Sequence, residues 1–536
     1  MTTFYLIDFA LSLAPAVLML AAVPLAWRRR ASVIASWRVF NALAVIALVC
    51  AFAALILQLT VAPAYGTPAA QPGWWLAPNR FGAWVSLLVQ LLGAAIGVFS
   101  AKHLQGEPRQ PVYIGALAAV LASVHFLLLA NHWIVLIVAW AAIEQAMHYL
   151  LCFYPDRPFA LLAAHKKRVT DRVVDVLLVV AAGLAWSQVG SGNLAALWAY
   201  VAAGHTSAAL TASAICLTLA VIARTALMPV HGWLVQVMEA PTPVSALLHA
   251  GVVNLGGYVL VFFAPLLAVS FAARWLLVAF GLVSAVVAGL VLLTRVSQKV
   301  HLAWSTIAQM GFMLLECGLG LYLFAALHLL GHSLYKAHNF LAASSAVKDC
   351  KRKILTGEAE NAGWSMATAI PVAIIVVALI QYLAGILVGG EGWPWWWSGV
   401  LALAWAPLLW VPKASAERAG VVVSRAATAV ATAILLTVAA CIVDRAPVGA
   451  ELQPLPVAGV VALCGMAVMY LEMVAFQLWP RRTVILRRWV YAGFYMDEGY
   501  TYAVLRGWPT HWAGADAGQT APVSISKVAA PGGVKA

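Results

Sequence analysis

Apolar runs of about 20 residues follow one another along nearly the whole chain, and short polar segments separate them. A run of that length can span the hydrocarbon core of a bilayer as an α-helix. The period-two alternation that marks the strands of a membrane β-barrel does not occur. The pattern therefore predicts an all-α polytopic membrane protein with about fifteen transmembrane helices. These predicted spans are residues 4–27, 40–62, 81–100, 112–130, 133–154, 173–187, 209–237, 242–265, 274–293, 301–318, 321–347, 365–387, 397–411, 421–443 and 457–478.

One stretch, residues 221–260, is apolar overall, yet it carries Arg224, His231, Glu239 and His249 and is interrupted by prolines. A charge buried in hydrocarbon costs several kcal/mol, so such groups normally face a bundle interior or a wet cavity. Proline frees backbone carbonyls, which need polar partners at membrane depth. Because transporters form ion sites where a helix is broken beside titratable groups, this stretch predicts discontinuous helices along an ion pathway.

Composition supports a location in the membrane. Of the 536 residues, 64% are hydrophobic and 10% are charged, whereas a soluble domain is about half apolar and a quarter charged. The seven cysteines are scattered without a CxxC pair, which indicates buried apolar positions rather than a metal site or a disulfide framework. No basic segment precedes the first apolar run, so we expect a retained span rather than a signal peptide.

The net charge of +13 comes from basic residues in alternate short loops, including residues 165–168 before the sixth predicted span. No nucleic-acid-binding module accompanies them, so nucleic acid is not an expected partner. Because positive loops stay in the cytoplasm, we expect the N-terminus outside and the C-terminus in the cytoplasm. The domains expected are a transmembrane domain at 1–480 with a conducting core at about 112–347, an interfacial cytoplasmic helix at 481–512 and a disordered tail at 513–536.

Glu144 lies in the middle of the fifth predicted span, and His148 follows one helical turn later on the same face. The two can exchange a proton or a hydrogen bond; alternatively, they form a buried polar pair that fixes helix packing. Arg224 remains protonated, so it cannot relay a proton, but it can be a fixed counter-ion for a carboxylate such as Glu144. The alternative for Arg224 is a span-end arginine that snorkels to the interface.

A second cluster consists of His328, His332 and Lys336, which are spaced by four residues and so stack on one helix face. A buried lysine accepts and releases protons readily, so the row predicts a proton relay. A zinc site is a poor alternative, because lysine is rarely a ligand and no carboxylate or thiol joins the row. His249 is a further candidate, although a single histidine in an apolar turn is often structural.

Three residues are secondary candidates for the pathway: Asp175, Glu239 and Lys299. Asp171 and Asp175 lie at the start of the sixth predicted span, where acidic groups suit the helix dipole or line a cytoplasmic mouth of the pathway. Lys299 and Glu316 lie near span ends, where a role as solvated caps explains them equally well.

Two segments carry a family resemblance. The sequences MPVHGWL and MEAPTPVSALLHAG occur within residues 226–257, and HLAWSTIAQMGFM and HLLGHSLYKAHNFLAASS follow residue 299. They closely resemble the antiporter-like membrane subunits of respiratory complex I and of multi-subunit cation/proton antiporters, over about residues 130–347. Within that superfamily, FYPDRPFALLAAHKKRVTDRVVD and HSLYKAHNFL are most similar to the membrane subunit of DAB-type inorganic-carbon accumulation complexes, and GFYMDEGY is a weaker match.

The resemblance implies an antiporter-like fold with inverted repeats and discontinuous helices. It also implies proton conduction through a buried Glu–Lys pair and a row of His and Lys residues. The residues that match family positions are His249, His328, His332 and Lys336.

This chain departs from the family pattern in three places. Arg224 stands where the family usually has lysine, and Glu144 lies about one turn from the usual glutamate position, which Ala141 occupies. Residues 365–387 contain Pro371 but no charge, so the second broken helix of the family is degenerate here. Coupling through a protonating lysine at position 224 is therefore not expected.

In the carbon-accumulation family, the partner is a soluble or peripheral zinc-bearing, carbonic-anhydrase-like subunit on the cytoplasmic side. The resemblance implies that this chain is a multi-pass subunit of a bacterial inner membrane rather than an enzyme, with no cofactor of its own and with zinc in the partner. It would pass cations, protons above all, down their gradient and so drive the partner's conversion of CO2 to bicarbonate. Two alternatives stay open: a subunit of a complex I-type pump or multi-subunit Na+/H+ antiporter, and a non-conducting membrane anchor.

Overall fold

The computed structural model describes residues 2–27, 32–60, 74–342, 361–389, 392–411, 419–444 and 453–510. The predicted tail at 513–536 lies outside the described residues. Within the described ranges, the chain is built of helices, as predicted, and eleven of these are long and apolar enough to cross a membrane.

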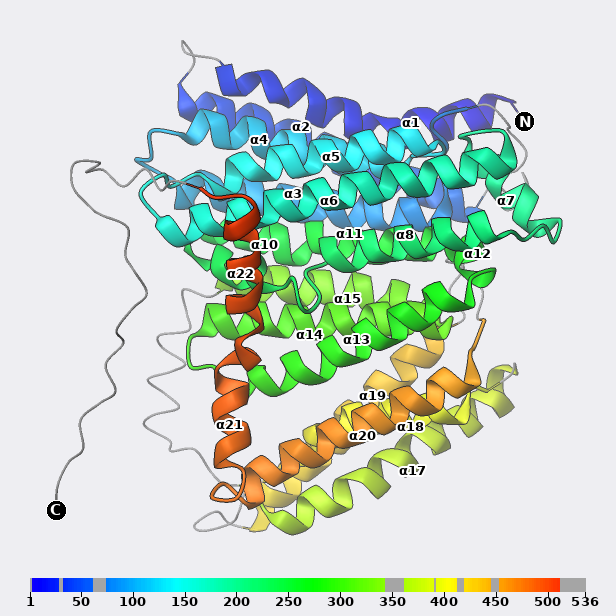
Figure 1. The fold of residues 1–536 in the computed structure, drawn as a ribbon, viewed down its shortest axis with the longest axis vertical. Coiled ribbons are helices and arrows are strands. Elements are labelled where there is room, and N and C mark those ends of the chain that lie inside the picture. Colours follow the sequence, from blue (N-terminus) through cyan, green and yellow to red (C-terminus); the bar gives the residue numbers. More distant parts are fainter. Residues whose placement is uncertain are drawn as a thin grey trace.

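Most of the helices lie side by side in a first bundle, which occupies the upper two thirds of the view (Figure 1). Its principal helices are α1 (Thr2–Ala22), α2 (Val33–Thr60), α3 (Arg80–His103), α4 (Gln110–Leu128), α5 (Trp133–Leu151), α6 (Pro158–Val189), α8 (Ala208–Arg224), α10 (Thr242–Ala250), α11 (Leu255–Phe262), α13 (Phe271–Leu292), α14 (Gln298–Leu319) and α15 (Tyr322–Leu341). Shorter connecting helices are α7 (Leu194–Ala202), α9 (Gly232–Gln236) and α12 (Ala264–Ala268).

A smaller second bundle lies below the first (Figure 1). It consists of α17 (Gly363–Val388), α18 (Trp395–Trp405), α19 (Ala419–Val443) and α20 (Pro456–Leu478). Aromatic side chains join the two bundles: the ring of Trp397 lies 5.1 Å from that of Phe324 on α15 and 6.0 Å from that of Phe312 on α14. Since aromatic pairs at this spacing pack favourably, the second bundle is fixed against the first.

Two short helices, α21 (Val484–Tyr491) and α22 (Met496–Gly507), cross the ends of the other helices at a steep angle (Figure 1). The predicted single helix at 481–512 is thus two helices, because the backbone at Phe494 and Tyr495 has positive φ and turns the chain between them. Their placement at the membrane interface stays a prediction.

The fifteen predicted spans each overlap a described helix, but their number stays a prediction. Two of these helices, α8 and α18, are apolar but shorter than a full span. Two others, α6 and α15, carry several charged or titratable side chains and are not among the eleven apolar spans. These polar helices are the ones that carry the candidate site.

The predicted cytoplasmic loop at residues 165–168 is wrong, and the sixth predicted span, 173–187, is the second half of a longer helix. Helix α6 has 32 residues and begins at Pro158, so the basic segment and the acidic residues after it are in its interior. Lys166 and Lys167 are buried because carboxylates from other elements pair with them. When the ion-pair partners of a charged helical segment come from distant parts of the chain, the sequence of that segment alone looks like that of a polar loop.

The predicted discontinuous helices are confirmed. Helix α8 ends at Arg224, Ala226 takes a left-handed conformation with φ of 56°, and the chain turns through α9 before α10 begins. A second interruption follows His249, where a 3-10 turn separates α10 from α11. By contrast, α17 continues through Pro371, so the later half has no break within residues 365–387.

Helices α13 and α14 pack backbone against backbone. A β-carbon added to Gly281 would lie 2.7 Å from the Gly311 carbonyl oxygen and 2.7 Å from the Leu315 nitrogen. Small residues permit this close approach, which substitutes for a hydrophobic driving force between helices in lipid.

We expect Gly281→Val to destabilise the first bundle, because overpacking of a tight contact costs about 1–3 kcal/mol. The measurement is the thermal unfolding midpoint of the detergent-solubilised chain. Gly183→Val is the matched control, since no atom lies within 4 Å of a β-carbon at that exposed position of α6. An equal midpoint for the two variants would contradict the packing argument.

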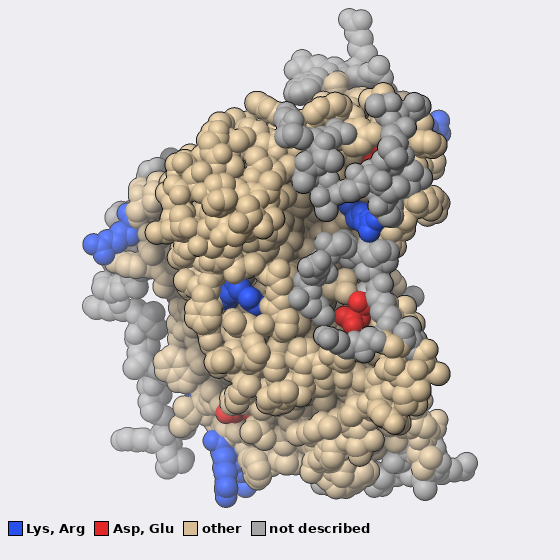
Figure 2. Space-filling view, turned by 90° about the vertical axis from the view of Figure 1, so that its right-hand side faces the viewer, with Lys and Arg blue, Asp and Glu red and all other residues tan. Residues whose placement is uncertain are grey.

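The two faces of the molecule differ in charge. Figure 2 shows the face on which α1 begins and α7 lies, and most of its described surface is uncharged. Basic residues gather at the opposite end, where Arg295 lies over the ring of Tyr491 on α21, with its guanidinium carbon 5.3 Å from the ring centroid. This asymmetry agrees with the predicted orientation, which stays a prediction.

Candidate functional site

A group of ionised side chains lies between α5, α6 and α8. The Glu144 carboxylate of α5 forms an ion pair with the Lys167 ammonium of α6. The Arg224 guanidinium of α8 approaches Glu144 from the other side, with Nε 3.6 Å from Oε1. All three side chains are nearly inaccessible, at 3–6% exposure, which places the charges inside the bundle.

Two carboxylates of α6 complete this first cluster. Lys167 Nζ donates to Asp171 Oδ2 at 2.8 Å, one helical turn away, and Arg224 Nη2 donates to Asp175 Oδ1 at 3.0 Å. Three carboxylates therefore share two buried cations. Arg172 also pairs with Asp175, so three carboxylates face three cations when all six groups are ionised.

A small hollow reaches the first cluster. Its water-accessible volume is about 30 Å³, enough for about two water molecules. Four of the five charged groups, all but Arg224, line the hollow, together with His148, Arg168 and Arg172. Arg172 is 70% exposed and pairs with Asp175 at 3.3 Å, so the cluster has a wet side.

His148 lies at the rim of the hollow rather than against Glu144. Its ring contacts Arg168 Nη2, and its Nε2 lies 3.7 Å from the sulfur of Cys152. The predicted hydrogen bond between Glu144 and His148 is not among the contacts of the described residues, because Lys167 takes that side of Glu144. Arg224, by contrast, has the predicted position of a counter-ion beside Glu144.

The second cluster lies between α10, α14 and α15. Lys336 is fully buried, and its ammonium donates to the backbone carbonyl of Leu302 at 2.9 Å. His249 Nδ1 lies 3.0 Å from Thr306 Oγ1, one helical turn along α14 from that carbonyl. Among the described residues, no carboxylate is within ion-pair distance of Lys336; besides the Leu302 carbonyl, its ammonium meets the ring of Tyr335, 5.8 Å from the centroid.

The row continues from Lys336 along α15 to Glu316. His332 is buried, and its ring centroid lies 6.1 Å from that of His328. His328 Nδ1 lies 3.0 Å from Glu316 Oε2, and Nε2 lies 2.7 Å from Gln309 Oε1. Glu316 is only 4% exposed, so the alternative of a solvated cap is wrong for this residue.

Several buried polar atoms near the two clusters have no hydrogen-bond partner among the described residues. Both ring nitrogens of His231 and of His332 are in this group, as are Ser245 Oγ and His249 Nε2. Buried polar groups normally bond to protein or to ordered water. Their concentration on α10, α15 and the segment before α9 marks a polar, hydratable interior.

Of the three secondary candidates, one lies in the first cluster and two lie outside both clusters. Asp175 belongs to the first cluster. Glu239 lies elsewhere: its Oε2 accepts from the Ala160 N–H at 3.3 Å and its carbonyl from Arg157 at 2.6 Å, so it caps the start of α6. Lys299 is half-buried in the first turn of α14 and joins neither cluster in the described contacts.

The sequence predictions did not include Lys167 among the candidates, and they left Asp171 with either a structural role or a place at a cytoplasmic mouth of the pathway. One signal was present: the two are spaced by four residues, as expected for an intrahelical ion pair. Because the segment was interpreted as a loop, that spacing carried no weight. The pairing of Lys167 with Glu144 also accounts for the arginine at position 224, since a titratable cation reaches the glutamate from α6 instead of α8.

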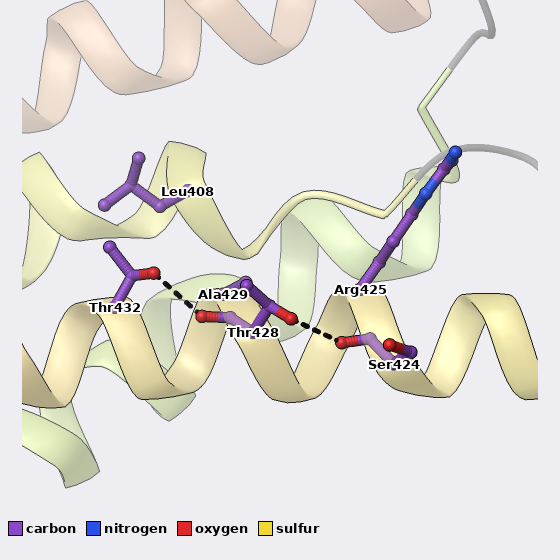
Figure 3. A pocket seen from close by; sticks show the side chains of 6 residues that line it. All are labelled: Leu408, Ser424, Arg425, Thr428, Ala429 and Thr432. Carbon is purple, nitrogen blue, oxygen red and sulfur yellow. Dashed lines mark hydrogen bonds between the residues drawn. The ribbon is translucent and has the colours of Figure 1, made fainter.

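A larger hollow, of about 300 Å³, lies in the second bundle (Figure 3). Thr428 and Thr432 donate to carbonyls of their own helix, at 2.9 and 2.8 Å, so their hydroxyls are already used. Arg425 is the one charged residue of the lining. None of the predicted site residues lines this hollow, and it adds nothing to the two clusters.

Among the described residues, no group of three or more His, Cys, Asp or Glu side chains is arranged to hold a metal ion. The Glu, Lys, His and Arg side chains of the two clusters can exchange protons and bind ions. An all-helical membrane fold with broken helices and buried Glu–Lys and His–Lys groups defines the class of antiporter-like membrane subunits.

Comparison with known proteins agrees with this class and narrows it. Residues 130–386 match the family model described as NADH:quinone oxidoreductase/Mrp antiporter, TM. A chain of the Mrp complex from Dietzia sp. has the same fold, with a TM-score of 0.54, 20% identity, and coverage of 94% of this chain and 62% of that one.

Two relatives are more similar in sequence. The "Probable inorganic carbon transporter subunit DabB" of Hydrogenovibrio crunogenus is 36% identical over 446 residues, which cover 82% of this chain and 84% of the relative. The "Probable inorganic carbon transporter subunit DabB2" of Halothiobacillus neapolitanus is 44% identical over 259 residues, 48% of this chain and 47% of the relative. The chain belongs to the DabB family within the antiporter-like superfamily.

Proposed function

We propose that this chain conducts protons through the membrane as a subunit of an inorganic-carbon accumulation complex. The observation that supports this most directly is the burial of both ionisable clusters inside one helix bundle. Such groups are costly in hydrocarbon and are kept where an ion passes. The relatives are named as inorganic carbon transporter subunits, which supports a role in inorganic-carbon accumulation.

The proposed route begins at the hydrated hollow beside the first cluster. Glu144 and Lys167 exchange the proton, and Arg224 is the fixed charge that keeps Glu144 ionised between transfers. The proton then passes to His249 and Lys336 through the hydratable interior around Ser245.

The second half of the route follows α15. Lys336, His332 and His328 hand the proton along one helix face to Glu316, which pairs with His328 at 3.0 Å. Each of these groups can both bind and release a proton, as a relay requires. The last partner, Glu316, lies near the end of α14.

The chemistry of carbon uptake is proposed to occur on a partner. A zinc-bearing, carbonic-anhydrase-like subunit on the cytoplasmic side would hydrate CO2 to bicarbonate and a proton, and cation flow through this chain would drive that conversion. The homologues are subunits of larger assemblies, which supports a complex. The zinc belongs to the partner in this proposal, and the chain itself is not the enzyme.

The proposed setting is a bacterial inner membrane, with the N-terminus outside and the C-terminus in the cytoplasm. The small number of charged side chains on the described part of the face in Figure 2 supports this orientation. On α21, the exposed Ile485 and Trp489 are four residues apart and share one face, which suits a helix at the lipid interface.

Carbon accumulation by cells that express the complex should stop when an uncoupler collapses the proton gradient. The measurement is uptake of labelled inorganic carbon, with and without the uncoupler, at constant ATP. Replacement of external Na+ by K+ is the control that separates protons from sodium. Uptake that ignores the uncoupler would favour the non-conducting anchor.

Affinity purification of the chain tests the partner. One soluble subunit with stoichiometric zinc supports the proposal. Co-purification of many hydrophobic subunits would instead favour a complex I-type pump or a multi-subunit Na+/H+ antiporter, the assemblies to which the matching family model also applies.

A further inference from the structure

Helix α22 lies across the first half of α6 and covers Lys166 (Figure 1). The Lys166 ammonium is fully buried and pairs with the Asp497 carboxylate, and it also donates to Thr501 Oγ1 at 2.7 Å. Gln236 of α9 donates to Asp497 Oδ2 at 2.9 Å. A single carboxylate of α22 therefore joins α6 to the segment that follows the broken helix.

The fit between α22 and α9 depends on a glycine. A β-carbon at Gly232 would overlap the Asp497 carboxylate, so any other residue there would displace that carboxylate from its contacts. Gly232 belongs to the MPVHGWL segment. Gly232 lies in the regular helix α9, so its backbone conformation does not require glycine. The close contact with Asp497 does, because it leaves no room for a β-carbon.

Tyr500 makes the second attachment, one helical turn after Asp497. Its hydroxyl contacts Thr170 Oγ1 and donates to the Lys166 carbonyl at 3.2 Å. Burial raises the pKa of the Tyr500 phenol to about 12, so the hydroxyl keeps its proton and remains a donor.

Along α6, each residue that contacts α22 is followed directly by a residue of the first cluster. Lys166 and Thr170 form one strip of α6 that faces α22, whereas Lys167 and Asp171 form the adjacent strip that faces Glu144. Both strips have the four-residue spacing of a helix face. A rotation of α6 that loosened the first strip would therefore turn the second strip away from Glu144.

We propose that α22 is a strap that fixes the rotation of α6 and so holds Lys167 and Asp171 in register with Glu144. Asp497 and Tyr500 are positioning residues: they act on the pathway through Lys166 and Thr170 and do not carry the proton themselves. The inference rests on the proposed function for its effect on uptake. Functional groups need to be held within about 0.5 Å of their working geometry, which is the task assigned to the strap.

Two single variants test the contact from opposite sides, Asp497→Asn on α22 and Gly232→Ala on α9. We expect each to lower inorganic-carbon accumulation by the complex by about fivefold, within the range known for mutations that act through a neighbouring element. We also expect faster hydrogen–deuterium exchange in residues 158–171 of the purified complex. The matched control is Glu498→Gln, an exposed neighbour of Asp497, which should change neither quantity.

A reversible clamp separates positioning from folding. In the double variant Gly232→Cys with Asp497→Cys, the carboxylate that a β-carbon at position 232 would overlap is gone, and the two facing thiols can be joined by a disulfide. Complexes in proteoliposomes should transport at a higher rate when this bond is oxidised than after reduction, although the amount of folded protein is the same. The variant Asp497→Cys alone is the control for effects of the reductant.

Unchanged exchange in residues 158–171 for both single variants would overturn the inference. So would faster exchange with full uptake, because α22 would then be structural only. If Lys336→Met keeps full uptake, the proposed function fails, and the exchange experiment still decides whether α22 fixes α6.

Discussion

Replacement of Lys336 by methionine is expected to lower inorganic-carbon accumulation by at least about 100-fold, the usual effect of removing a group that transfers a proton. Lys336 is fully buried and bonds to the Leu302 carbonyl alone among the described residues. Methionine has a similar shape and no charge, so it removes the relay group and leaves no buried ion behind. The measurement is uptake of labelled carbon at equal amounts of the chain in the membrane.

Lys336→Met separates a loss of function from a loss of folding. Replacing a buried charge by an apolar side chain of similar volume is often neutral or stabilising, so the fold should survive. Lys102→Met, at an exposed position near the end of α3, is the control for the loss of a lysine. Normal uptake by Lys336→Met with normal protein levels would remove Lys336 from the pathway and favour the non-conducting anchor.

Much of the fold was predictable because lipid imposes one strong constraint. In lipid, the backbone N–H and C=O groups of a membrane helix must hydrogen-bond within that helix, so long apolar runs mark helices reliably. The predicted interruption of residues 221–260 was also confirmed: α8 ends at Arg224, before Pro229, which cannot donate a helical hydrogen bond. The same rule failed for α6, where Lys166 and Lys167 interrupt the hydropathy pattern and the helix continues through them.

The site was predictable where all its members lie on one helix. The row of His328, His332 and Lys336 is visible as a four-residue spacing, and the structure places the three on α15 as expected. Glu316 was not assignable, because its partner His328 comes from another helix. Lys167 was missed for the same reason. The spacing of residues in the sequence predicts contacts within one helix, but it does not predict which side chains of two different helices pair.

Glu144→Gln and Lys167→Gln are each expected to abolish carbon accumulation, for different reasons. The glutamine at position 144 cannot bind and release a proton, and it leaves Lys167 with Asp171 as its carboxylate partner within the described contacts. The glutamine at position 167 leaves Glu144 with Arg224 alone, at 3.6 Å. Breaking a buried ion pair from one side costs about 3–5 kcal/mol, so both single variants should also lower the amount of folded chain.

The double variant separates the two effects. With glutamine at both positions, no unpaired charge of the Glu144–Lys167 pair remains, so the amount of folded chain should recover toward the wild type. Carbon accumulation should remain at least about 100-fold lower, because the exchange of a proton between the two groups is lost. Both quantities are measured on the same membranes, by quantitative immunoblot and by uptake of labelled carbon. Recovery of uptake together with protein would show that the pair only stabilises the bundle, and conduction would then have to pass through α15 without it.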